Sequence, residues 1–349
     1  MLPVAVPAQP SVAGLGEVLR ALRPIVGDAA VQSAGQELTL ERMSRPVDPP
    51  SLSHAEPLEG GGPRAVPRSP TPMVAAFLDG IQRSRVVGHV AGVPLVFGTV
   101  AAVIRQRVQR RLETWGTPRV HRALFASRAQ LGESWWQRLE ATALPLVDIT
   151  EGQPMATVSP HPLAQRARAL DVVALEREQA ERQLAAAWCA SESGWLWIDG
   201  GVAGNLSVDE RAPAFGVVKS HNTLYGDANA VRDVLTLRAG ERTPAFLVGH
   251  RPRRAVASWY LRLREAPNGD PLHGLVRVEI APPSALAVPA GDQTTAPRVM
   301  LPGFTARVDE LSSWILAEGA PLSLPDPRWD TLTYGVYACE QYLRSIVGS

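Results

Sequence analysis

Lysine is almost missing from this chain of 349 residues, because Lys219 is the only lysine among 35 basic residues. With 34 acidic residues the formal net charge is +1, which excludes a globally basic nucleic-acid coat, so nucleic-acid binding would need local patches. Only Cys189 and Cys339 are present, without a Cys-x-x-Cys pair. Two cysteines exclude a disulfide framework and favour a reducing, cytoplasmic compartment. No apolar run approaches roughly 18 residues, so we expect no membrane span.

Hydrophobic residues make up 45% of the chain, which is enough for a sizeable core. Residues 1–39 are predicted to be an N-terminal helical segment, with one helix over 12–26. Residues 40–72 are rich in proline and contain three successive glycines, which predicts a poorly packed connector. We expect residues 73–349 to form the folded domain.

The domain begins with β patterning. Apolar segments separated by glycines predict an antiparallel meander of three strands over 74–79, 84–90 and 93–103. The basic stretch 105–111 fits a strand or a helix, either as a solvated face or as a phosphate contact. Helices and strands alternate afterwards: helices over 162–190, 228–237, 304–317 and 334–346, and strands over 194–199, 215–219, 244–249, 255–264 and 274–281. This order predicts an α/β (α+β) fold with a mixed sheet flanked by helices.

Two of the predicted strands end in Asp-Gly. Apolar and aromatic residues lead to an aspartate and then to glycine at Asp79 and again at Asp199. A single Asp-Gly is typical of a turn. If the two strands are neighbours in one sheet, their carboxylates meet at a common edge, where hard divalent cations bind.

The helix over 162–190 offers a further carboxylate for such a site. Glu181 lies closest to the apolar residues of the helix, and Glu178 shares its face. A two-metal phosphodiesterase needs several carboxylates that converge, and either glutamate would serve. The alternative for both is a solvated acidic face.

Lys219 ends an apolar strand and is followed by His221 and Tyr225. An ammonium at a strand end can stabilise charge on a scissile phosphate. A lone histidine such as His221 is more typical of a hydrogen-bonded structural residue than of a catalyst. The spacing of histidines and cysteines does not indicate a zinc site.

The strands predicted over 255–264 and 274–281 alternate apolar and charged residues. Such strands present one charged face, here with Arg262, Arg264 and Arg277. We expect either a groove that binds the phosphate backbone, with Trp259 or Tyr260 stacking on a base, or an exposed face paired with acidic neighbours.

Four short motifs, in this order, resemble the NurA nuclease family. They are Leu78-Asp79-Gly80, residues 197–200 after the glutamate-bearing helix, residues 216–221 with Tyr225, and residues 334–340. The resemblance covers roughly residues 74–345. It implies an RNase H-like core and a manganese- or magnesium-dependent nuclease in DNA end processing, repair or defence. It also implies a homodimer that works with a HerA-type hexameric ATPase.

The resemblance also assigns residues. Asp79 and Asp199 look like the metal-binding aspartates, Glu181 or secondarily Glu178 like the helical glutamate, and Lys219 like the strand-end lysine; His221 and Tyr225 would contact nucleic acid. Two positions depart from the family pattern: Ile81 follows the first Asp-Gly in place of serine, and Glu340 replaces a histidine. Glu340 would then be an added metal ligand.

Two other functions remain open. The chain could be a non-catalytic nucleic-acid-binding or partner-docking module on the same fold, which would tolerate loss of Asp79 or Asp199. It could also be another RNase H-like enzyme, such as a ribonuclease or a transposase-related protein, although no sequence feature indicates recognition of a 2′-hydroxyl.

Overall fold

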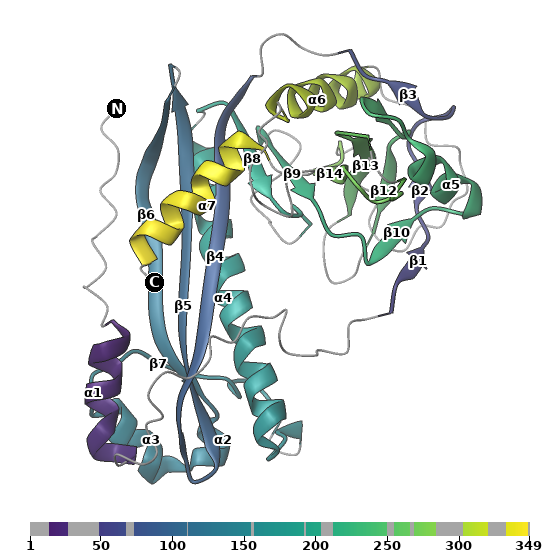
Figure 1. Cartoon of the computed structure of the whole chain (residues 1–349). Helices are drawn as coiled ribbons and strands as arrows, with labels where there is room; N and C mark the ends of the chain where they lie inside the picture. The colour runs from purple at the N-terminus through teal and green to yellow at the C-terminus, as the bar shows by residue number, and fades with distance from the viewer. Residues whose placement is uncertain are drawn as a thin grey trace.

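The computed structural model describes residues 14–26, 49–67, 73–109, 111–154, 157–191, 193–203, 212–249, 255–265, 269–283, 303–319 and 333–347. These residues form a 12-stranded mixed sheet, a separate pair of short strands, and helices against both faces of the large sheet (Figure 1). The predicted α/β class with a mixed sheet flanked by helices is confirmed.

The strands are numbered in chain order. They are β1 (Ser51–Ser53), β2 (Glu56–Pro57), β3 (Arg64–Ala65), β4 (Val74–Val90), β5 (Val93–Val108), β6 (Arg111–Ala126), β7 (Leu146–Asp148), β8 (Trp195–Asp199), β9 (Ala214–Val218), β10 (Thr223–Tyr225), β11 (Glu241–Arg242), β12 (Phe246–Val248), β13 (Val256–Arg262) and β14 (Leu275–Ile280). The large sheet has the order β2-β12-β13-β14-β9-β8-β4-β5-β6-β7, with β11 beside β13 and β3 beside β11. Strand β8 lies parallel to both β4 and β9, whereas β5 lies between β4 and β6 and is antiparallel to both.

The helices are α1 (Leu15–Val26), α2 (Arg128–Leu131), α3 (Glu133–Glu140), α4 (Pro162–Ala190), α5 (Ala228–Thr236), α6 (Phe304–Glu318) and α7 (Tyr334–Val347). The predicted bounds of α4 are confirmed. Its start follows from local chemistry, because Pro162 occupies the first turn and the His161 ring accepts a hydrogen bond from the Leu163 N–H. Helix α1 packs through Val18 and Leu22 with the far end of the meander.

The meander differs from the prediction in one respect. Residues 74–90 form one continuous strand, not two, with a register shift between Val86 and Gly88. Gly80 does not break the strand because its backbone pairs with Ala102, and the space that its side chain would need is filled by Glu181. Residues 105–108 belong to β5, so the strand interpretation of the basic stretch is correct there.

Alternation along the central strands divides the core between the two faces. Phe77, Trp197 and Phe215 face the cluster that contains α6 and α7, whereas Leu78 and Leu196 face the cluster that contains α4 and α5. In Figure 1, α7 crosses the front of the long strands and α4 runs along their other side. By the same period of two, Asp79 lies on the α7 face.

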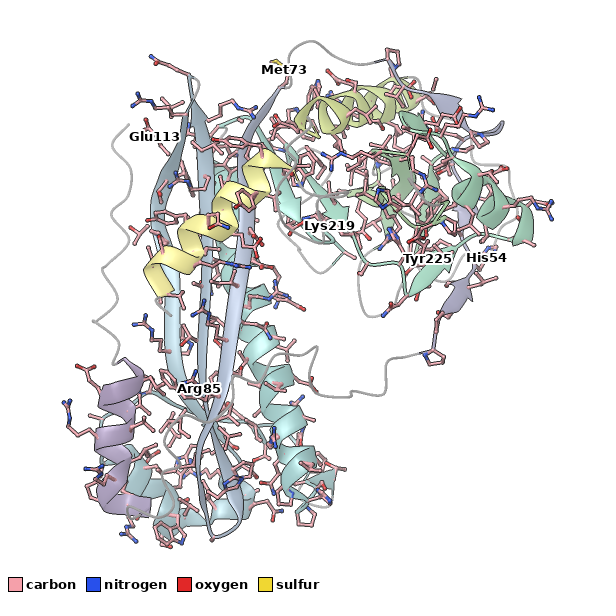
Figure 2. All side chains as sticks on the ribbon, viewed as in Figure 1. His54, Met73, Arg85, Glu113, Lys219 and Tyr225 are labelled. Carbon is pink, nitrogen blue, oxygen red and sulfur yellow. The ribbon has the colours of Figure 1, made fainter. Side chains whose placement is uncertain are left out.

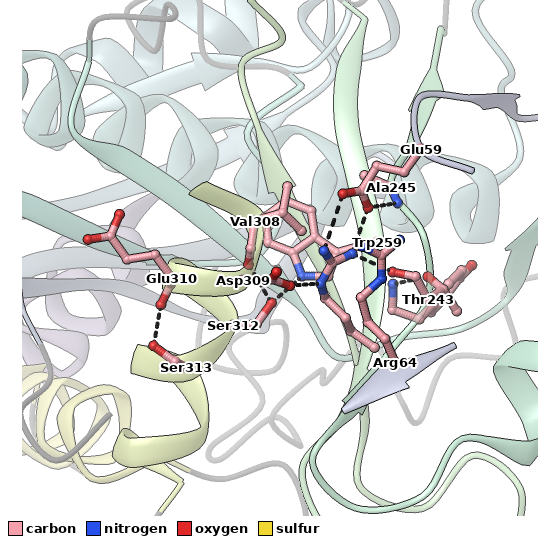
Figure 3. Close-up of polar contacts among 12 residues, drawn as sticks. Glu59, Arg64, Thr243, Ala245, Trp259, Val308, Asp309, Glu310, Ser312 and Ser313 are labelled. Atoms are coloured by element: carbon pink, nitrogen blue, oxygen red, sulfur yellow. Dashed lines mark hydrogen bonds and ion pairs between the residues drawn. The ribbon is translucent and has the colours of Figure 1, made fainter. Parts of the chain in front are cut away.

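The connector prediction is wrong for residues 49–67, which we name the strap. Its three short strands pair with β10, β12 and β11. The buried Arg242 forms ion pairs of 2.6 Å with the buried Glu59 of the strap and with Asp309 of α6, which is 35% exposed (Figure 3 labels Glu59 and Asp309). Glycine and proline leave the backbone of the strap irregular, but this buried network docks it. The remaining parts of the predicted connector, 40–48 and 68–72, lie outside the described residues.

Candidate functional site

The two Asp-Gly strands are neighbours, as expected for a shared site. Leu78 of β4 is in register with Ile198 of the parallel strand β8, so the next residues, Asp79 and Asp199, lie side by side. Asp79 is 9% exposed. Burial, and then the charge of Asp199, raise the pKa of Asp79 well above its usual range. The two strands therefore hold the Asp79 and Asp199 carboxylates close enough for their negative charges to repel each other.

Lys219 supplies the opposite charge. It follows β9, the next strand of the sheet, and its Nζ lies 2.6 Å from Oδ1 of Asp199. Both side chains remain about a quarter exposed, at 24% each. Figure 2 labels Lys219 beside the end of β9, between the long meander and the second half of the sheet. One ammonium thus stands beside a pair of aspartates.

Glu181 of α4 reaches the same place from the opposite face. A methyl group on Gly80 would lie 2.2 Å from Oε1 of Glu181, so Gly80 is what permits the helix to bring this carboxylate against β4. Burial raises the pKa of Glu181 to about 7, opposed by the ion pair with Arg177 and assisted by the charges of Asp199 and Glu178. The structure therefore brings Glu181 together with Asp79 and Asp199.

A cavity of about 270 Å³ opens at the end of β8. Apolar side chains, among them those of Leu78, Ile198 and Val218, line it. Its walls carry both signs of charge, from the acidic residues Glu178, Glu181, Asp199 and Glu279 and the basic residues Arg177, Arg182 and Arg277. Glu178, the second choice for the helical ligand, thus lines the cavity beside Glu181.

Two residues near the site were missed in the sequence. Cys339 of α7 donates its thiol to the Phe77 carbonyl at 3.3 Å. Burial and the Asp79 charge raise the pKa of Cys339 well above its usual range, so the thiol stays protonated. Glu279 of β14 is 3% exposed and lines the cavity. The alternation of charged and apolar residues around Glu279 predicted a half-buried strand with one charged face, and no sequence signal marked Glu279 as part of a site.

Glu340 follows Cys339 on α7. Its Oε1 accepts a hydrogen bond from Arg344, one turn further on, at 2.6 Å. The side chain is 12% exposed, so the carboxylate lies near the protein surface in an intrahelical ion pair. Metal ligation by Glu340 remains a prediction.

The expected phosphate-binding surface on β13 is wrong for Arg262. Its side chain is 2% exposed, and its guanidinium donates to the carbonyls of Leu237 at 3.1 Å and Pro271 at 2.7 Å. The reason is that β13 is a central strand, with both faces covered by the rest of the fold. Arg264, half-buried, donates to the Gly319 carbonyl at 2.9 Å.

The aromatic residues expected to stack on bases are also interior. Trp259 and Tyr260 are fully buried. The Tyr225 ring is buried beneath the Arg277 guanidinium, 4.9 Å from its centroid. His221 Nε2 lies 2.8 Å from the Leu275 carbonyl, and burial lowers the pKa of His221, so its ring is neutral near pH 7. These contacts support the structural interpretation of His221, which is half-buried, and they keep the Tyr225 ring in the interior.

The donor chemistry of the site suits a hard cation. Asp79, Asp199 and Glu181 offer carboxylate oxygens, and mutual repulsion among them is what a divalent ion would relieve. In the part of the chain that the structure describes, however, no three His, Cys, Asp or Glu side chains already stand in an arrangement that could hold a metal ion. The residue types therefore fit a cation, although their described positions are not a finished ligand shell.

Comparisons with known proteins add no assignment: no protein-family model matches this chain, and no curated protein matches it significantly. Among the described helices, none is long and apolar enough to cross a membrane.

Proposed function

We propose that this protein is a divalent-metal-dependent DNA nuclease of the NurA type with an RNase H-like core. The observation that carries the proposal is the convergence of Asp79 and Asp199, from adjacent parallel strands, with Glu181 from α4 and Lys219 beside Asp199. An antiparallel meander followed by strands parallel to its first strand agrees with that fold. Raised pKa values of Asp79 and Glu181 are typical of a functional site.

The residues have separate roles in this proposal. Asp79, Asp199 and Glu181 would hold Mn²⁺ or Mg²⁺, whose chemistry is to activate the attacking water and to stabilise the leaving oxygen. Lys219, held next to the carboxylates by its contact with Asp199, would stabilise negative charge on the scissile phosphate. The apolar side chains that line the cavity beside these charges would lower the local dielectric constant and so strengthen the interactions of the charges.

Because Arg262 is interior, the phosphate backbone needs other contacts. Arg177 and Arg182 line the cavity from α4, the helix that carries Glu178 and Glu181. We assign phosphate contact to Arg177 and Arg182. Association as a homodimer, with a HerA-type ATPase, rests on the family resemblance and is part of the proposal.

A second candidate is a non-catalytic DNA-binding or partner-docking module. One observation favours it: within the described ranges, no trio of metal-ligating side chains is assembled. Lys219 already neutralises Asp199, as a purely structural ion pair would.

The test is cleavage of single- and double-stranded DNA with Mn²⁺ or with chelator. Asp199→Asn keeps the size of the side chain and removes its charge, and activity should fall more than about 100-fold, since even outer-shell changes at metal sites cost 10- to 100-fold. Asp233→Asn, on α5, is the matched control and should keep full activity. Full cleavage by Asp199→Asn would refute the assignment. Binding of DNA and Mn²⁺ by the wild type without any cleavage would support the second candidate.

A further inference from the structure

The turn that follows Asp199 is built tightly against two neighbouring strands. Gly200 has φ +119°, a conformation that favours glycine, and its N–H donates to the Val217 carbonyl of β9 at 2.9 Å. A methyl group on Gly216 would lie 2.4 Å from the Gly200 carbonyl oxygen. The chain therefore folds back over β9 immediately after Asp199, across a strand position that only glycine can occupy.

Glu279 holds the other side of this turn. Strand β14 pairs with β9, with Glu279 opposite Gly216, so its side chain reaches across the glycine to residues 200–202. Its Oε2 accepts a hydrogen bond from the Val202 N–H at 2.8 Å. A methyl group on Gly201 would lie 2.8 Å from the same oxygen, so the turn and the carboxylate are in close contact at two successive residues.

The carboxylate of Glu279 is itself fixed. Arg277, two residues earlier on β14, donates to its Oε1, and the same guanidinium donates to Ser258 Oγ at 3.2 Å. The Tyr225 ring lies against the other side of Arg277. The ion pair with Arg277 and the hydrogen bond from Val202 thus hold both oxygens of the Glu279 carboxylate. Because the carboxylate is buried, its reorientation would leave a buried N–H or a buried charge without a partner.

We propose that Glu279 is a positioning residue that sets the direction of the Asp199 carboxylate by holding the Gly200–Gly201–Val202 turn. This inference rests on the proposed function, because it assigns Glu279 to the supporting shell of the proposed cation site. Asp199 is the last residue of its strand, so the backbone of the turn that follows it determines how well the orientation of its carboxylate is fixed. Outer-shell contacts that orient metal-binding carboxylates contribute substantially to metal affinity.

Gly201→Ala tests the contact without removing any charge. The added methyl displaces the Glu279 carboxylate, while the backbone of Gly201 has an ordinary φ that alanine accepts. The Mn²⁺ concentration that gives half of the full melting-temperature shift should rise about tenfold. Turnover should fall while KM for DNA changes less than about threefold, since the phosphate-binding residues are untouched. Gly249→Ala, with open space around its Cβ, is the matched control and should behave as the wild type.

Glu279→Asp shortens the side chain by one methylene and so withdraws the carboxylate from the turn. Together with Gly201→Ala it makes a double-mutant cycle. Alone, it should weaken Mn²⁺ binding as Gly201→Ala does. In the double variant the shorter side chain makes room for the new methyl, so the two effects should be less than multiplicative. Amide exchange of Val202 should accelerate in Glu279→Asp, and this readout does not depend on metal or on activity.

The outcomes separate the inference from the function on which it rests. Unchanged Val202 exchange, or unchanged Mn²⁺ response in both single variants, would overturn the positioning role while the nuclease proposal stands. Faster exchange with unaltered metal response and turnover would show a purely structural contact, which also overturns it. A wild type that neither binds Mn²⁺ nor cleaves DNA would instead overturn the proposed function, and the positioning role with it.

Discussion

Two groups of charged residues in this protein differ in how their charges are compensated. Around Arg242, two carboxylates meet one guanidinium that also donates to the Thr243 carbonyl, and Glu59 accepts a further bond from the Ala245 N–H (Figure 3). Around Asp79, three carboxylates crowd together with Lys219 and Arg177 at the edges. In the first group every charge has an ion-pair partner, and only Asp309, at 35% exposure, reaches the solvent. The second group has more carboxylates than nearby cations and opens into a cavity.

The pKa directions express this difference. Burial acts to raise the pKa of Glu59, but hydrogen bonds from Arg242, Thr305 and Ala245 outweigh it and the pKa is lowered. For Asp79 and Glu181, burial and neighbouring negative charge prevail and the pKa values are raised. Hydrogen bonds and an ion pair stabilise the charged form of Glu59, as in a structural network. Burial and like charges destabilise the charged forms of Asp79 and Glu181, which is the condition that the proposed cation site requires.

The largest expected effect comes from breaking the network around Arg242. Arg242→Met leaves Glu59 buried without its partner, and the free energy of unfolding should fall by about 3–5 kcal/mol. Urea unfolding would measure it, and proteolysis within the strap should accelerate because the strap loses its buried anchor. The double variant Glu59→Gln/Arg242→Met, which removes both charges, should recover part of the loss. A change below about 1 kcal/mol would show that the network is not what docks the strap.

The same change of carboxylate to amide should act oppositely in the two groups. Glu59→Gln should destabilise the protein, because the amide cannot satisfy the Arg242 charge. Asp79→Asn should leave the melting temperature without metal unchanged or raise it, because it removes a carboxylate that repels Asp199. Metal should then raise the melting temperature of the wild type but not that of Asp79→Asn. Equal destabilisation by both variants would remove the contrast between the groups.

The dependence of stability on pH should also differ in sign. Glu181 has a folded pKa of about 7, above its unfolded value of 4.5, so its contribution is present at low pH and is lost as pH rises from about 4.5 to 7. Asp79 acts in the same direction. Glu59, with its lowered pKa, contributes above its unfolded value and loses that contribution as the solution becomes more acidic.

Unfolding without metal across this pH range, in the wild type, Glu181→Gln and Glu59→Gln, would separate the two contributions. Glu181→Gln should flatten the loss between about pH 4.5 and 7, and added Mn²⁺ should do the same by favouring the ionised carboxylates. A wild type whose stability rises through this window would contradict the raised pKa of the site.

Features that depend on residues close together in the sequence were predictable, whereas features that depend on contacts between distant residues were not. The bounds of α4 were predicted because apolar periodicity and local turn chemistry determine them. The sequence predicted two strands that end in Asp-Gly but left open whether they are neighbours, because their pairing joins distant parts of the chain. The docked strap was not predicted, since Glu59 and Arg242 are 183 residues apart and nothing near either marks the other. Arg262 was misassigned to an exposed face because alternation shows the two faces of a strand but not whether later elements cover both.

The smallest effect is expected from a substitution at the acidic site that changes the shape of a side chain but keeps its charge. Lys219→Arg keeps a cation beside Asp199, so the melting temperature and the Mn²⁺-induced shift should both stay close to those of the wild type. A guanidinium is planar and broader than an ammonium, so it cannot place its charge at the same point, and turnover should fall even so. Single-turnover cleavage at saturating Mn²⁺ would measure this. Unaltered turnover would show that Lys219 serves only to balance Asp199, as Arg242 balances Glu59, and would make the two groups alike in this respect.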